Sequence, residues 1–168
     1  MTIAVTPFDG FCGFRPLSEI ISFLKSTPQL RALVGESKAD LFIAAVGDKA
    51  DANDEAIIAA NKKALKDLFE AVMTAEEAHI KKLAGELVES ATQSPESFGG
   101  KEYGGKEFAD LIIRLDGQFP GDIGLFCSFL LNYVKLQPGE AMFLQANDPH
   151  AYLSGGLFRL PPLSCNTS

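Results

Sequence analysis

The chain has 168 residues, and its acidic side chains outnumber its basic ones by 22 to 15, giving a formal net charge of −7. This balance argues against nucleic acid or an anionic membrane as the main partner, since both are bound through basic surfaces. Hydrophobic residues make up 46% of the chain, enough for a folded core, yet no apolar run reaches the roughly 18 residues of a membrane span.

The N-terminal part of the chain contains one predicted strand and two short predicted helices. Residues 2–7 are rich in β-branched side chains and predict a strand. Residues 8–14, FDGFCGF, follow neither the helical nor the strand period, so we expect a packed turn whose phenylalanines enter the core. Pro16 fits the first turn of a helix, and a short helix over 29–33 is expected to end at Gly35.

Two amphipathic helices are predicted in the middle of the chain, over residues 54–73 and 75–93. Their apolar side chains recur at helical spacing and leave a polar face. Thr74 and Glu77 have the spacing of a capping box, which places a helix start between the two. Because neither helix can bury its apolar stripe alone, we expect them to pack on each other as a hairpin, followed by a loop over 94–105.

The last part of the chain changes from helical to strand-like character. One more helix is predicted over 108–115, ended by Gly117. Short apolar runs separated by turn residues then predict strands over 130–136, 141–144 and 150–153. This succession resembles a piece of a small β-barrel.

Cysteine and histidine are both rare in this sequence. Cys12, Cys127 and Cys165 are far apart and form no CxxC pair, which favours a reducing, cytoplasmic location over a disulfide framework or a cysteine-built zinc site. The N-terminus also lacks the pattern of a signal peptide. With only His79 and His150, the chain has little room for a self-contained histidine metal site.

His150 is the strongest candidate for a metal ligand. It follows Pro149, and on a strand it points to the same face as Tyr152, two residues further on. A single histidine beside a proline is nevertheless more often an ordinary surface or core residue. The acidic pairs in the middle of the chain lie in first helical turns and fit capping roles. Spacing alone therefore predicts a helical domain joined to a β-fragment with one possible ligand.

Two segments resemble the type I mannose-6-phosphate isomerase (phosphomannose isomerase) family. The first is TPFDGFCGFRPLSEI near the N-terminus, and the second is FPGDIGLFCSFLLNYVKLQPGEAMFLQANDPHAYLSG. The second is the more specific, because it contains the Pro-Gly-Asp-Ile-Gly, Pro-Gly-Glu-Ala and Pro-His-Ala-Tyr blocks in order. The resemblance covers about residues 2–155.

The resemblance implies a mainly α fold with a small β part, in which a helical domain is flanked by partial cupin (jelly-roll) strands. Residues 1–15 would form a cupin strand and entry turn, and residues 16–128 the helical domain. Residues 129–154 would form the cupin strands that carry the histidine, and residues 155–168 a divergent tail without regular structure.

The resemblance also implies an activity and a zinc site. In the family, zinc is held in the cupin barrel by a Gln-x-His motif, a Lys-Pro-Glu motif and the histidine of Pro-His-Ala-Tyr, which here is His150. Tyr152 matches the tyrosine that faces the sugar-phosphate substrate, and no catalytic base is identified. The enzymes interconvert mannose 6-phosphate and fructose 6-phosphate and so supply GDP-mannose.

Two of the three ligand motifs have no counterpart in this sequence. The Lys-Pro-Glu motif would lie just before Met1, and from Gly156 onward the sequence departs from the family pattern. We therefore expect a truncated chain that is inactive alone, because one imidazole cannot replace a full ligand set. The alternative is a non-catalytic helical interaction or regulatory module, and a distinct cupin metalloenzyme is a weaker third option.

Overall fold

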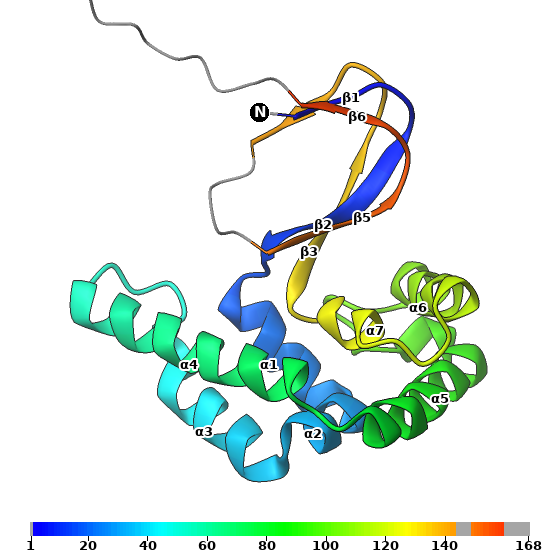
Figure 1. Ribbon diagram of the computed structural model, residues 1–168. Helices are drawn as coiled ribbons and strands as arrows, with labels where there is room; N and C mark the ends of the chain where they lie inside the picture. The colour runs from blue at the N-terminus through cyan, green and yellow to red at the C-terminus, as the bar shows by residue number, and fades with distance from the viewer. Residues whose placement is uncertain (1, 144–148, 160–168) are drawn as a thin grey trace, which may run out of the picture. The chain divides into compact units, whose positions relative to one another are not determined.

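The structure is a computed structural model that describes residues 2–143 and 149–159, and it divides into two compact units (Figure 1). The helical unit is Arg15–Leu130, and the β unit is drawn from both ends of the chain, up to Phe14 and from Leu131 onward. This confirms the predicted fold class, mainly α with a small β part. Among the described residues, no helix is both long and apolar enough to cross a lipid bilayer.

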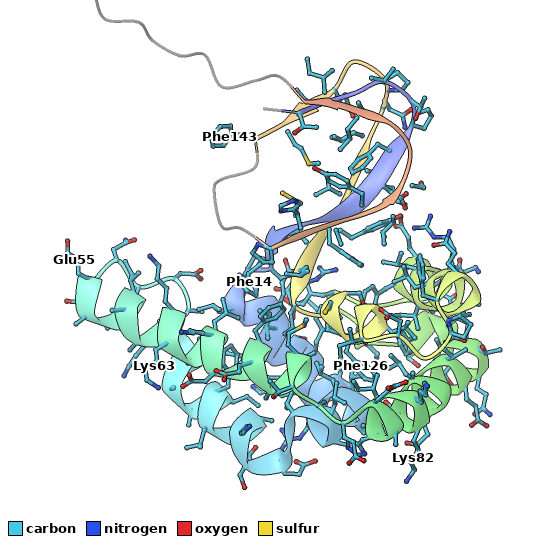
Figure 2. The ribbon with its side chains drawn as sticks, in the orientation of Figure 1. Phe14, Glu55, Lys63, Lys82, Phe126 and Phe143 are labelled. Atoms are coloured by element: carbon cyan, nitrogen blue, oxygen red, sulfur yellow. The ribbon has the colours of Figure 1, made fainter. Side chains whose placement is uncertain are left out.

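The helical unit contains seven α-helices, and each of them buries apolar side chains. They are α1 (Leu17–Ser26), α2 (Pro28–Val34), α3 (Glu36–Val46), α4 (Glu55–Met73), α5 (Glu77–Gln93), α6 (Lys106–Gln118) and α7 (Gly124–Cys127), with 3-10 turns η1 (Gly47–Lys49) and η2 (Pro95–Ser97). Phe126 is fully buried, whereas Glu55, Lys63 and Lys82 lie on outward faces (Figure 2). The helices form because their apolar side chains repeat every three or four residues.

Aromatic rings form the centre of the helical unit. Phe23 from α1, Phe108 from α6 and Phe129 after α7 lie within 5.3 Å of one another, measured between ring centroids. The Arg15 guanidinium lies 5.2 Å from the Phe23 centroid, and its Nη1 pairs with Glu19 at 2.9 Å. Burial of such rings is a large apolar contribution to stability, and the cation adds to it.

The two long helices exist as predicted, but their expected pairing is wrong. α4 packs mainly on α3, and α5 packs mainly on α6 and α2. The predicted capping box is also wrong, since Thr74 ends α4 and its hydroxyl donates to the Glu70 carbonyl at 2.7 Å. α3 was not predicted at all, and its presence supplies the partner that α4 needs. α6 also runs through Gly117 and ends at Gln118.

The described residues of the β unit form two three-stranded antiparallel sheets. Their strands are β1 (Thr2–Ala4), β2 (Phe8–Phe14), β3 (Leu131–Leu136), β4 (Ala141–Met142), β5 (His150–Ser154) and β6 (Leu157–Arg159), in the orders β4-β1-β6 and β3-β2-β5. A small apolar cluster of Ala4, Phe8 and Leu136 lies inside this unit.

Two expectations about the β unit are wrong. Residues 8–14 form the central strand β2 rather than a packed turn, and a bulge between Phe11 and Phe14 explains why their sequence lacks a clean alternation. Leu157–Arg159 form β6 and pair with β1, where a tail without regular structure was expected. Such a short strand carries too few residues to show a period. Residue 144 of the predicted strand over 141–144, most of the turn after it and residues 160–168 lie outside the described residues.

Candidate functional site

His150 and Tyr152 both lie on β5, the last strand in the order β3-β2-β5 among the described residues. In the pairing with β2, His150 is opposite Cys12 and Tyr152 is opposite Gly10. Because side chains alternate along a strand, the two rings share one face, and their centroids are 5.7 Å apart. The structure therefore brings together the two residues that the sequence singled out.

The close approach of β5 to β2 depends on Gly10. A Cβ atom at this position would lie 2.6 Å from the carbonyl oxygen of Ala151 and 2.9 Å from the Phe8 ring. Glycine leaves room for the Phe8 ring, which meets the Tyr152 ring edge to face with centroids 5.5 Å apart. A larger residue would push β5 away and move both candidate side chains.

On the face of β2 opposite to Gly10 lies a buried carboxylate, that of Asp9, which no sequence motif marked. Asp9 is 6% exposed, and it accepts hydrogen bonds from the Tyr133 hydroxyl, at 2.6 Å, and from the Ser154 hydroxyl. Because Tyr133 lies on β3 and Ser154 on β5, Asp9 ties both neighbours to the central strand. An acidic residue inside an otherwise aromatic segment is the signal that could have identified it, since buried charges need partners.

The described residues do not provide a complete zinc site. No group of three or more His, Cys, Asp and Glu side chains comes together within residues 2–143 and 149–159. Zinc is held by three or four such ligands, so His150, even with Cys12 opposite it, falls short of that number. His79 lies in the helical unit, where its Nε2 is 3.4 Å from the Ala32 carbonyl oxygen.

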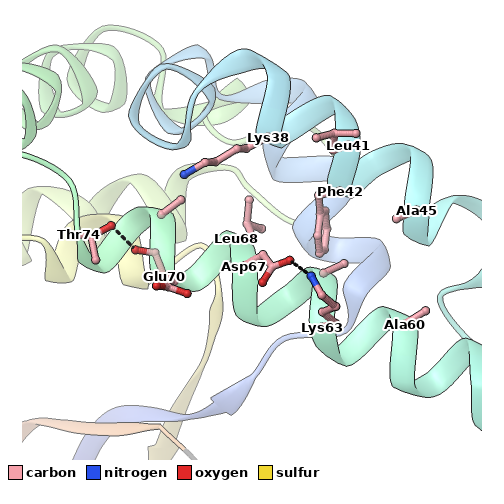
Figure 3. A pocket seen from close by; sticks show the side chains of 12 residues that line it. Lys38, Leu41, Phe42, Ala45, Ala60, Lys63, Asp67, Leu68, Glu70 and Thr74 are labelled. Carbon is pink, nitrogen blue, oxygen red and sulfur yellow. Dashed lines mark hydrogen bonds and ion pairs between the residues drawn. The ribbon is translucent and has the colours of Figure 1, made fainter.

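A hollow of about 650 Å³ lies between α3 and α4 (Figure 3). Its walls are mainly apolar, with Phe42 and Leu68 at the base and Leu41, 69% exposed, on the rim. Lys63 and Asp67 also line it and form an ion pair of 2.6 Å with each other. No histidine or cysteine lines this hollow, so it lacks a histidine-based catalytic pair and the nitrogen and sulfur ligands of a typical zinc site.

Comparison with curated proteins gives matches over nearly the whole chain. The mannose-6-phosphate isomerase of Aspergillus fumigatus is 47% identical over 173 residues, and that of Schizosaccharomyces pombe is 46% identical over 166 residues. Each match takes in 99% of this chain, and so extends beyond residue 155, where the sequence placed the end of the resemblance. The chain spans 38% of the length of these two relatives.

Solved structures of phosphomannose isomerases resemble the structure of this chain. A point mutant of phosphomannose isomerase from Salmonella typhimurium has a TM-score of 0.63 and 28% identity, covering 93% of this chain and 33% of that one. A zinc-bound mannose 6-phosphate isomerase has a TM-score of 0.60 and 29% identity, covering 93% of this chain and 32% of that one.

The family model for the helical insertion domain of type I phosphomannose isomerase matches residues 33–131, more than half of the chain. This range falls almost entirely in the helical unit. The chain therefore belongs to the type I phosphomannose isomerase family and contains that family's helical insertion domain.

Proposed function

We propose that this chain is a part of a mannose-6-phosphate isomerase, the enzyme that interconverts mannose 6-phosphate and fructose 6-phosphate for GDP-mannose supply. The identity of 46–47% to curated isomerases over 99% of the chain supports this activity. The observation that carries the proposal is the placement of His150 and Tyr152 on one face of β5, in the strand that the family resemblance marks as part of the metal site.

His150 would be one of several zinc ligands, and Tyr152 would face the sugar phosphate. The zinc-bound relative supports zinc as the metal of the family. The described residues lack the remaining ligands, so we derive no catalytic step through the metal and expect no turnover from this chain alone. The assignment of residues 1–15 and 129–154 to a cupin domain, and a cytoplasmic location, stay predictions.

A chimeric enzyme tests the proposal. Residues 2–159 of this chain would replace the aligned segment of the full-length Schizosaccharomyces pombe isomerase, and turnover would be measured by a coupled assay from mannose 6-phosphate. We expect an active chimera with bound zinc. His150→Ala should lower kcat/KM by about 100-fold or more and reduce the zinc content, because a ligand is lost.

The matched control is His79→Ala, which removes the other histidine of the chain and should leave both turnover and zinc content unchanged. If His150→Ala kept full zinc content and activity, its role as a ligand would be refuted. Turnover by the isolated 168-residue chain, abolished by His150→Ala, would refute the expectation that the chain is inactive alone.

Tyr152→Phe in the same chimera separates substrate contact from metal binding. Tyr152 is 51% exposed, so its side chain is open to a ligand. We expect unchanged zinc content and a fall in kcat/KM of about tenfold, the size of one lost hydrogen bond to a charged group. Unchanged kinetics would remove Tyr152 from the substrate site.

A non-catalytic interaction or regulatory module is the second candidate. The α3–α4 hollow favours it, because its walls are mainly apolar and Leu41 on its rim is exposed, and apolar hollows at a protein surface often mark contact surfaces. A folded but inactive chimera, together with capture of a full-length isomerase by this chain, would support this candidate over the first.

A further inference from the structure

The pairing of β2 with β5 is interrupted by a one-residue bulge directly after Tyr152. Gly10 pairs with Tyr152 and Asp9 with Ser154, so Leu153 is the extra residue on β5. A bulge breaks the alternation of side chains along a strand, and it therefore brings Ser154 to the face of Asp9. Bulges of this kind often lie beside functional residues and set the direction of their side chains.

A side-chain hydrogen bond joins the two strands at this bulge. The Ser154 hydroxyl donates to Asp9 Oδ1, and the Tyr133 hydroxyl, from β3, donates to Asp9 Oδ2 at 2.6 Å. Asp9 is 6% exposed, and a carboxyl group withdrawn from water needs such donors. If Leu153 paired with Asp9, Ser154 would turn to the other face and this donor would be lost. Asp9 therefore favours the observed register over the register without a bulge.

The register of β5 decides which way its functional side chains point. A slip by one residue turns every side chain of a strand to the opposite face. His150 and Tyr152 would then leave the face on which the Tyr152 ring meets the Phe8 ring, 5.5 Å away between centroids. We propose that Asp9 is a positioning residue of the isomerase site, acting through its hydrogen bond with Ser154. It holds β5 in register and so keeps both rings on the face that the site needs.

This inference rests on the proposed function, but its structural part can be tested without turnover. Ser154→Ala removes the donor on β5, and Tyr133→Phe removes the donor on β3. Because each variant takes one hydrogen bond from the same carboxyl group, both should lower the melting temperature of the full 168-residue chain by similar amounts. Only Ser154→Ala should free β5 from its register.

The nuclear Overhauser effect between the Phe8 and Tyr152 ring protons reports the face of β5 in the full chain. We expect its intensity to fall by about half or more in Ser154→Ala, because part of the population slips, and to stay at the wild-type level in Tyr133→Phe. Ser154→Thr keeps a hydroxyl at the same position and should preserve the signal. Absence of this signal in the wild-type chain, or an unchanged signal in Ser154→Ala, would overturn the inference.

Kinetics of the Schizosaccharomyces pombe chimera test the link to the reaction. Ser154→Ala should lower kcat/KM about tenfold, since displaced side chains lose their orientation toward the substrate, whereas Tyr133→Phe should stay within about twofold of wild type. In an Asp9→Leu background, Ser154→Ala should have no further effect, because the two residues act as one unit. Ser154→Thr should restore the wild-type kinetics.

The matched control for a general loss of stability is Asp116→Ala. Asp116 accepts a hydrogen bond from the Gly121 amide at 2.9 Å within the helical unit, so its loss should lower the melting temperature and leave kcat/KM unchanged. Equal kinetic losses in Ser154→Ala and Tyr133→Phe, or additive losses in the Asp9→Leu background, would overturn the positioning role. An inactive wild-type chimera would refute the proposed function instead, and the ring-to-ring signal would still decide whether Asp9 and Ser154 hold β5 in register.

Discussion

Cys127 shows how burial sets the chemistry of a single side chain in the helical unit. Burial away from water, together with the nearby charge of Asp122, raises the pKa of its thiol to about 11. Its sulfur lies 3.9 Å from that of Met73. The thiolate is the reactive form of cysteine, so Cys127 should be inert at neutral pH.

The rate of alkylation by iodoacetamide tests the raised pKa of Cys127. In a Cys12→Ser/Cys165→Ser variant, where Cys127 is the one remaining thiol, we expect the rate to rise with a midpoint near pH 11, against about 9 for an unfolded control. Because the folded-state pKa is raised, the neutral thiol favours the fold fully below pH 9, and this contribution is lost as the pH rises through about 11. A midpoint near 9 in the folded protein would contradict the burial.

At the scale of elements, two glycines should respond in opposite ways to substitution by alanine. A Cβ atom at Gly104, in the loop before α6, would overlap the backbone carbonyl of Phe98, whereas one at Gly117, inside α6, would meet nothing within 4 Å. We expect Gly104→Ala to lower the free energy of unfolding by about 3 kcal/mol, because backbone must move. Gly117→Ala should raise it by about 0.5–1 kcal/mol through helix propensity. Urea denaturation of both variants gives the comparison, and equal effects would contradict it.

Elements whose apolar side chains recur at regular spacing could be predicted from the sequence, whereas elements with irregular apolar spacing could not. α4 and α5 have long apolar stripes, but a stripe shows only that a partner is needed and not which one. α3 buries Ala39, Phe42 and Val46 while exposing Leu41, which weakens its pattern. The sharing of a face by His150 and Tyr152 follows from their spacing. The position of Cys12 opposite His150 depends on pairing between distant segments, which no local pattern carries.

At the scale of the whole molecule, the helical unit is closed on itself. Its first and last residues are joined by a hydrogen bond of 2.9 Å from the Arg15 amide to the Leu130 carbonyl. Its aromatic core is made by residues within the same unit. Domains with their own core and adjacent ends commonly fold alone.

We therefore expect an isolated 15–130 polypeptide to fold without the β unit. It should keep the helical far-UV circular dichroism signal and melt cooperatively. Leu87→Ala is the control, since this fully buried side chain belongs to the core of the unit, and its loss should lower stability by about 2–5 kcal/mol. A non-cooperative melt of the isolated polypeptide would show that the β unit is required.

The closed ends of the helical unit also bear on the order of folding. β2 and β3 are antiparallel neighbours that pair from Phe14↔Leu131 onward, so the whole helical unit takes the place of a hairpin loop between them. If those residues were an unfolded loop, bringing the two strands together would carry a large chain-closure entropy. Once the helical unit has folded, its ends already lie one hydrogen bond apart, and the long-range contact becomes effectively local. Strand pairing should therefore follow helix formation in time, with the helical unit acting as the nucleus for a sheet whose strands are remote in sequence.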